Sequence, residues 1–113
     1  MNEETAHNAM LIILNAGDAR VFCQQALKHL ANFEIDEAKE KMKEANKKIV
    51  EAHKIQTDAI QAETRGETKE YSLLFAHAQD TLMTIYSELN IAKQLVNLTC
   101  SIDERLKQVE RGM

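Results

Sequence analysis

Proline is absent from this chain of 113 residues, and glycine occurs only three times. Sharp chain reversals use these two residues more than most others, because they supply the backbone angles that a tight turn needs. A sandwich or barrel of many short strands is therefore excluded as an interpretation. The composition predicts long helices with few breaks, and the length fits one domain over residues 1–113.

The helical pattern breaks at two places, residues 32–36 and 64–67. Asp36 is a candidate N-cap for the helix after the first break, and Gly66 suits the left-handed position that often follows a helix. The pattern predicts three helices, over residues 3–31, 36–64 and 70–110. At about 1.5 Å per residue these are rods of roughly 40–60 Å. We therefore expect an all-α fold, an up-down-up bundle of three long antiparallel helices.

Apolar residues spaced by three and four predict a buried stripe on each of the first two helices. In the first helix these residues are Ala9, Ile13, Ala16, Ala19, Cys23, Ala26 and Leu30. In the second they are Ile35, Ala38, Met42, Ala45, Ile49, Ala52, Gln56 and Ala59. Alanine at so many positions lets the helices approach closely, and it predicts a modest core in each chain.

The third helix carries two stripes with this spacing. One is wholly apolar and is expected to close the bundle within the chain: Leu82, Ile85, Leu89, Ala92 and Val96. The other mixes apolar with polar residues: His77, Asp80, Thr84, Ser87, Ile91, Gln94, Leu98 and Ser101. A seam between several copies of the chain would explain the second stripe, because polar residues in such seams set the number of copies. The alternative is that Ile91 and Leu98 are ordinary exposed apolar residues.

Charge and cysteine content exclude several classes of protein. The net charge is −4 and lysines are interleaved with glutamates, so no basic stripe exists to neutralise nucleic-acid phosphates. Between residues 37 and 48 this mixture predicts the solvated face of a helix. Cys23 and Cys100 lie far apart and predict reduced thiols in a cytoplasmic protein. The acidic N-terminus and the short apolar run at residues 9–14 predict neither export nor membrane insertion.

His77 is the histidine with the most suggestive surroundings. If Ser72 is the N-cap of the third helix, His77 lies just beyond the first turn, near the positive end of the helix, where an anion is stabilised. Asp80 follows three residues later on the same face. The alternative is a histidine of the core or of an interface. His53 and Thr57 also share a helix face, but the second ligand of a zinc motif is missing, so zinc hydrolysis has no support.

Three short segments carry a resemblance to a known family. The most specific is His77-Ala78-Gln79-Asp80 with Leu82-Met83, preceded by Leu73-Leu74. The second is Glu51-Ala52-His53-Lys54-Ile55-Gln56-Thr57, and a weaker third is Gly17-Asp18-Ala19-Arg20. In this order they resemble the lactose/cellobiose-type enzyme IIA component of the bacterial phosphoenolpyruvate-dependent sugar phosphotransferase system. The resemblance covers about residues 9–97.

The resemblance implies a phosphocarrier. His77 would accept a phosphoryl group from phospho-HPr and pass it to a cysteine of the sugar-specific IIB component, during uptake of a disaccharide of the lactose, cellobiose or chitobiose class. It also implies a cytoplasmic homotrimer in which Asp80 of each copy meets at the axis. Three carboxylates repel one another, so the cluster needs bound protons or a hard cation such as Mg²⁺. The family usually has a second histidine directly after this aspartate, where this chain has Thr81.

A second class of function stays open beside the phosphocarrier. The helical stripes also suit a non-catalytic helical adaptor, in which they would pair only with a partner helix. Incubation with phosphoenolpyruvate, enzyme I and HPr distinguishes the two hypotheses, because only the phosphocarrier should gain one phosphoryl group that is lost in acid.

Overall fold

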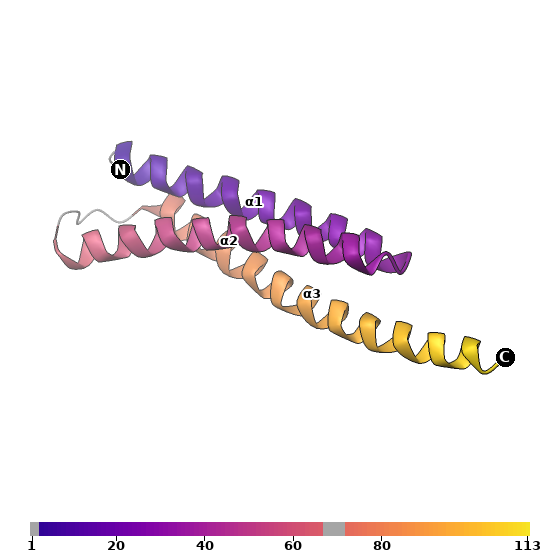
Figure 1. The fold of residues 1–113 in the computed structure, drawn as a ribbon. Coiled ribbons are helices and arrows are strands. Elements are labelled where there is room, and N and C mark those ends of the chain that lie inside the picture. The colour runs from indigo at the N-terminus through magenta and orange to yellow at the C-terminus, as the bar shows by residue number, and fades with distance from the viewer. Residues whose placement is uncertain (1–2, 67–71) are drawn as a thin grey trace.

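The computed structural model describes residues 3–66 and 72–113. These residues form three α-helices and no strand: α1 (Glu3–Ala31), α2 (Ile35–Thr64) and α3 (Leu73–Arg111). Figure 1 shows α2 returning alongside α1, and α3 starting beside them and then diverging toward the C-terminus. The prediction of three long helices is confirmed. The predicted start of the third helix at residue 70 lies outside the described residues, and α3 itself begins at Leu73.

The breaks between the helices lie where the sequence indicated, with one correction. Asp36 was predicted to cap the second helix, but α2 begins at Ile35 after Glu34, and Asp36 lies in its first turn. The turn is made by the backbone: Phe33 takes a left-handed φ of 57°. Its N–H donates to the carbonyl of Leu30 over 2.9 Å. Gly66, at the other end of α2, has a φ of 78°, which confirms the predicted left-handed position.

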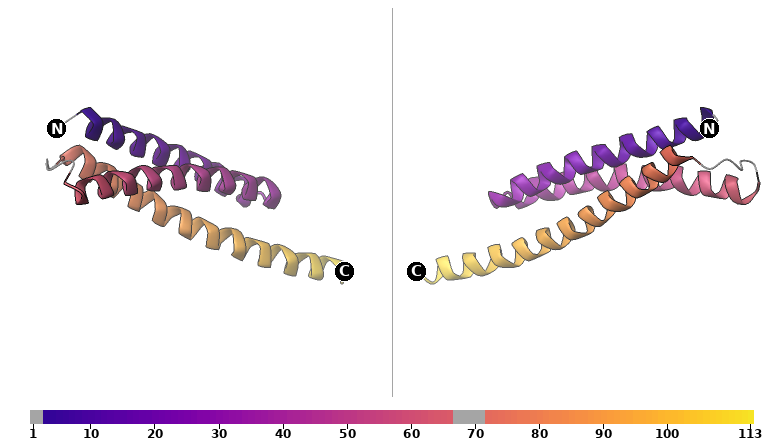
Figure 2. Two further views of the ribbon diagram at one scale, coloured as in Figure 1. Left: turned by 60° about the vertical axis from the view of Figure 1, so that its left-hand side comes forward. Right: turned by 180° about the vertical axis from the view of Figure 1, so that it is seen from behind.

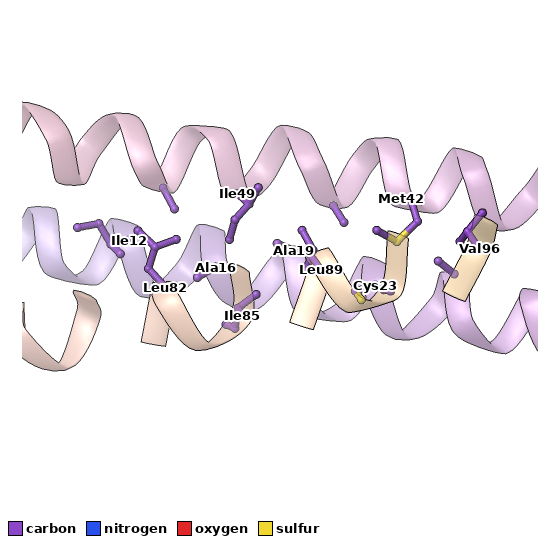
Figure 3. Close-up of a cluster of buried hydrophobic side chains, with 14 of the residues drawn as sticks. Ile12, Ala16, Ala19, Cys23, Met42, Ile49, Leu82, Ile85, Leu89 and Val96 are labelled. Atoms are coloured by element: carbon purple, nitrogen blue, oxygen red, sulfur yellow. The ribbon is translucent and has the colours of Figure 1, made fainter. Parts of the chain in front are cut away.

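The core is one layer of small and aliphatic side chains between the three helices (Figure 3). All five residues of the predicted apolar stripe on α3 are buried, and so is the middle of the predicted stripe on α2. On α1 the prediction is wrong at one position. Ile12 is fully buried, whereas Ile13 packs only partly against the core. The buried stripe of α1 is thus Ala9, Ile12, Ala16, Ala19, Cys23, Ala26 and Leu30.

The mixed polar and apolar stripe of α3 points away from this core. Each of its eight residues is exposed, and Ile91 and Leu98 are 60% and 56% exposed. Farther along the same helix Ile102, Leu106 and Val109 are exposed as well. Figure 2 shows from two sides that the C-terminal part of α3 leaves the α1–α2 pair, which agrees with the elongated extents of 67 × 20 × 17 Å. The core of one chain therefore leaves a long apolar face of α3 uncovered.

Two further predictions concern the cysteines and membrane insertion. Cys23 is buried, Cys100 is half-buried, and both are free thiols. None of the three helices, over the residues that the structure describes, has an apolar window long enough to cross a membrane.

Candidate functional site

The candidate site lies at the N-terminal end of α3, and Ser72 creates that end. Ser72 has an extended backbone, and its Oγ accepts a hydrogen bond from the N–H of Phe75 over 3.0 Å. This is the geometry of an N-cap, so the predicted cap is confirmed. The cap fixes where the helix starts, and it places His77 in the second turn.

His77 and Asp80 are both exposed on α3, three residues apart. Side chains at this spacing are neighbours on a helix surface. The first turn of α3 contains no Asp or Glu, so no carboxylate there offsets the positive end of the helix dipole. An exposed imidazole near that end suits an anionic group, because partial positive charge from the backbone amides lies close by.

Thr81 occupies the position where related sequences were expected to carry a second histidine. Its Oγ1 donates a hydrogen bond to the carbonyl of His77 over 2.9 Å, back along the same helix. A hydroxyl held in this way bonds to the backbone that carries His77. The hydroxyl of Thr81 is thus engaged with the helix backbone, and the imidazole of His77 is the exposed nitrogen base of this segment.

His53 lies in a different environment. Its ring meets that of Tyr86 edge-on, with 4.9 Å between the ring centroids, and its Nε2 is buried with no hydrogen-bond partner in the described structure. Tyr86 follows His77 by about 13 Å along α3 at the usual helical rise. His53 therefore packs between α2 and α3, and the structure does not bring it to His77.

The segment from Gly17 to Arg20 ties the three helices together. Asp18 of α1 forms an ion pair with Lys48 of α2 over 3.7 Å, and Arg20 of α1 forms one with Glu88 of α3 over 2.8 Å. Sequence reasoning did not single out Glu88, because a pair 68 residues apart has no local spacing signal. These contacts give this segment a role in holding α3 against α1.

A metal site cannot be assembled from one copy of the chain as described. Within residues 3–66 and 72–113, no three His, Cys, Asp or Glu residues lie close enough together to hold an ion. Asp80 is an exposed oxygen donor of the kind that Mg²⁺ prefers, and it lies on the same outward stripe as Ile91 and Leu98. Its carboxylate would hold such an ion together with water oxygens and, where copies of the chain meet, with the carboxylates of those copies.

The comparison with known families decides the class of protein. A family model described as the lactose/cellobiose-specific IIA subunit of the phosphotransferase (PTS) system matches residues 7–99. The chain belongs to this family. The match includes all three segments on which the resemblance was based, so that prediction is confirmed.

Individual relatives of this IIA chain agree in sequence and fold. It is similar to the lichenan-specific phosphotransferase enzyme IIA component of Bacillus subtilis, at 34% identity, over 93% of this chain and 96% of the relative. The crystal structure of the PTS cellobiose-specific enzyme IIA from Bacillus anthracis has a TM-score of 0.84 at 36% identity. That comparison covers 92% of this chain and 95% of the other.

A further solved structure of the IIA family includes a partner. The solution structure of the IIA(chitobiose)–HPr complex of Escherichia coli matches this chain with a TM-score of 0.77 at 29% identity. The match covers 90% of this chain and 99% of the other. HPr is therefore the partner that a structurally similar IIA protein binds.

Proposed function

We propose that this IIA chain is a phosphocarrier that receives a phosphoryl group on His77 from phospho-HPr. It then passes the group to a cysteine of a sugar-specific IIB component in the cytoplasm, during uptake of a disaccharide. The observation that carries the proposal is the exposed imidazole of His77 near the capped N-terminus of α3 in a member of the IIA family. The HPr complex of a similar protein supports the choice of donor.

The chemistry is an exchange of one bond to phosphorus for another. A ring nitrogen of neutral His77 attacks the phosphorus atom of phospho-HPr, and the bond to the donor histidine breaks as the new N–P bond forms. In the second step a cysteine thiolate of IIB attacks the same phosphorus and the N–P bond breaks. His77 leaves as neutral imidazole, because its other ring nitrogen has kept its proton throughout. Such transfer asks the protein mainly for positioning and charge stabilisation. The amides at the start of α3 are suited to stabilise the phosphoryl charge.

Assembly into a homotrimer is a second part of the proposal. A narrow, alanine-rich core leaves Ile91, Leu98 and the apolar residues beyond them exposed in one chain. Contiguous apolar surface of this kind marks an interaction site, and the spacing of the stripe suits helix pairing. In the proposed trimer the α3 helices meet along this stripe. An axial Mg²⁺ held by Asp80 of each copy would offset the repulsion between the three carboxylates.

Phosphorylation measured by mass spectrometry tests the phosphocarrier proposal. The chain is incubated with phosphoenolpyruvate, enzyme I and HPr, and we expect a gain of one phosphoryl group that is lost in acid. His77→Ala should abolish this gain while leaving the helix content unchanged. His7→Ala, on an exposed position of α1, and His53→Ala should still accept the group. Phosphorylation of the His77 variant would show that another residue is the acceptor.

The non-catalytic adaptor gives the opposite result in this experiment. It predicts no gain of mass with the complete donor system, although the helices would still bind a partner. A second incubation with purified IIB then tests the onward step, because phospho-IIA should lose its group to the cysteine of a matching IIB. A panel of IIB proteins of the lactose, cellobiose and chitobiose classes identifies the sugar branch.

A further inference from the structure

A groove lies between α2 and α3. Figure 1 shows that α3 diverges from the other two helices toward the C-terminus. Its volume is about 710 Å³, which is within the usual range for small-molecule sites. Its floor is apolar, with Met42 from α2 and Val96 from α3. The other lining residues are four lysines and two asparagines: Lys39, Lys43, Lys47, Lys93, Asn46 and Asn97.

The charge of the groove is opposite to that of the whole protein. The chain has a net charge of −4, yet none of the described residues that line the groove is Asp or Glu. Lys43 and Lys47 pair with Glu40 and Glu44, but these pairs are exposed and three residues apart on one helix. Exposed pairs of this kind contribute little free energy, so they leave both lysines free to exchange partners. The groove therefore carries a local excess of positive charge.

Lysines on two different helices converge on this space. Lys39, Lys43 and Lys47 succeed one another at intervals of one helical turn on α2. Lys93 faces them from α3, and its Nζ donates to Oδ1 of Asn46 on α2 over 3.4 Å. This contact across the groove directs the ammonium group of Lys93 toward α2. A ligand between the helices would thus meet positive charge from both walls.

The small number of apolar residues in the floor favours a compact ligand over a partner helix. A docked amphipathic helix needs apolar anchors over several turns of its groove. Here Met42 and Val96 are the apolar floor residues, and they are only 8% and 6% exposed. The aliphatic stems of the lining lysines add apolar surface to the walls. The groove is open to solvent and can hold a small molecule against one wall of each helix, but it offers no long seam to a helix.

We propose that this groove binds a phosphorylated sugar of about disaccharide size. Ammonium groups bind phosphate as mobile point charges, which accounts for the four lysines. Side-chain amides both donate and accept hydrogen bonds, so Asn46 and Asn97 suit the hydroxyl groups of a sugar. The choice of a sugar rests on the proposed function in sugar uptake, whereas the choice of a phosphate rests on the lysines alone. Such a ligand would report the product of uptake back to the IIA component.

The groove is separate from the proposed phosphorylation site. Lys93 lies two residues from Ile91, about 200° around α3, so it faces away from the stripe that carries Ile91 and Asp80. Lys93 also lies more than four turns after His77 along the same helix. A ligand in the groove therefore leaves both the proposed trimer seam and the imidazole of His77 uncovered.

Titration calorimetry and amide NMR on the full chain test this proposal. The probe is a phosphorylated cellobiose, and the controls are cellobiose and inorganic phosphate. We expect the phosphorylated sugar to bind more tightly than either control, and to shift the amide signals of residues 39–47 and 93–97. Binding should weaken as salt is added, because exposed charges are screened. Removing one groove lysine should weaken binding about two- to fivefold.

Matched variants separate the groove from general surface charge. Lys39→Gln/Lys93→Gln should weaken binding about tenfold, whereas Lys28→Gln/Lys54→Gln removes the same charge elsewhere and should leave it unchanged. The wild type and both double variants should still be phosphorylated on His77. Absence of binding, equal binding of cellobiose, or equal binding of inorganic phosphate would each overturn the proposal. If phosphorylation of His77 fails while the phosphorylated sugar still binds, the proposed function is wrong and the groove assignment stands.

Discussion

Arg20 and Glu88 connect α1 to α3 through two parallel hydrogen bonds. Nε of Arg20 donates to one carboxylate oxygen over 2.9 Å, and a terminal guanidinium nitrogen donates to the other over 2.8 Å. The hydrogen bond to Glu88 raises the pKa of Arg20 above its usual value. His77 precedes Glu88 by about three helical turns, so the two share one side of α3. The pair therefore adds a polar contact to the buried stripe of α3, on the side of the helix that presents His77.

The first prediction concerns the stability that this pair contributes. Both side chains are more than a third exposed, so solvent screens them, and Glu88→Gln should lower the free energy of unfolding by only about 0.5–1 kcal/mol. The matched control is Glu40→Gln, which breaks an exposed pair within α2 and should have almost no effect. Urea unfolding of both variants measures the difference. Equal losses in the two variants would contradict a specific role for the Arg20–Glu88 geometry.

The second prediction concerns Cys23 at alkaline pH. Burial raises the pKa of this thiol, and the negative charge of Glu88 raises it further. Because the folded pKa lies above the unfolded value of about 8.5, the protonated thiol stabilises the fold below that pH. This contribution is lost as the pH rises through the folded pKa. Melting temperatures of the wild type should therefore fall more steeply above about pH 8.5 than those of Cys23→Ala.

Cys100 supplies the control for this pH dependence. Cys100→Ala should keep the steep alkaline loss, because the buried Cys23 thiol is still present. In the wild type, an alkylating reagent should label the half-buried Cys100 well before Cys23. Rapid labelling of Cys23 in the folded protein would show that α1 opens far more readily than its burial implies.

The third prediction compares two glycines with different backbones. Gly17 lies inside α1, and a methyl group added there meets no atom within 4 Å. Gly17→Ala should raise the free energy of unfolding by about 0.5–1 kcal/mol, because alanine favours the helix. Gly66 has a φ of 78°, so Gly66→Ala should lower it by about 1 kcal/mol. Thermal melts of the two variants should shift in opposite directions, and a loss of stability in Gly17→Ala would indicate that another copy packs on that position.

The fourth prediction tests which isoleucine of α1 belongs to the core. Ile12→Ala should cost about 2–5 kcal/mol, since this fully buried side chain leaves a cavity. Ile13→Ala should cost clearly less, because its neighbourhood is partly open to solvent. Denaturant unfolding of both variants gives the comparison. Similar losses would mean that α1 is rotated from the position described.

Ile12 and Ile13 show how far the sequence alone determines the fold. Spacings of three and four located all three helices, and a strict alternation of those spacings from Ala9 selects Ile12, so the signal was present. The prediction of Asp36 as the N-cap of α2 was wrong because the turn depends on the left-handed backbone of Phe33. α2 then begins after Glu34 without a hydrogen bond from a capping side chain. Ser72 and Gly66 were predictable, since each position demands a residue of that type.

The residues of the candidate site were selected in a different way. His77 and Asp80 were recognised because their motif is local and contiguous. The groove lined by lysines could not be predicted from the sequence, because the Lys/Glu mixture of residues 37–48 predicts only a solvated helix face. This helix face becomes one wall of a groove because Lys93, about fifty residues later, lies opposite it and because α3 diverges from α2. When charged residues of two helices far apart in the sequence line one groove, neither helix alone shows a spacing pattern that predicts it.

The last prediction concerns Asp80 in the proposed trimer. If three carboxylates meet at the axis, a chelator should lower the melting temperature of the wild type by several degrees, because the ion offsets their repulsion. Asp80→Leu should then form a trimer that is at least as stable and indifferent to chelator, since the apolar side chain removes the repulsion. Asp58→Leu, at an exposed position of α2, keeps the axial carboxylates and should still respond to chelator.

Light scattering accompanies these melts, because the argument depends on the number of copies. We expect about three times the chain mass of 12.8 kDa for all three proteins, and a melting temperature that rises with protein concentration. If Asp80 instead faces solvent on separate copies, Asp80→Leu should have the same melting temperature as the wild type. A chelator should then change the melting temperature of neither protein. A wild type that is monomeric across micromolar concentrations would contradict the proposed trimer. Without a trimer axis, there would be no reason to expect an ion at Asp80.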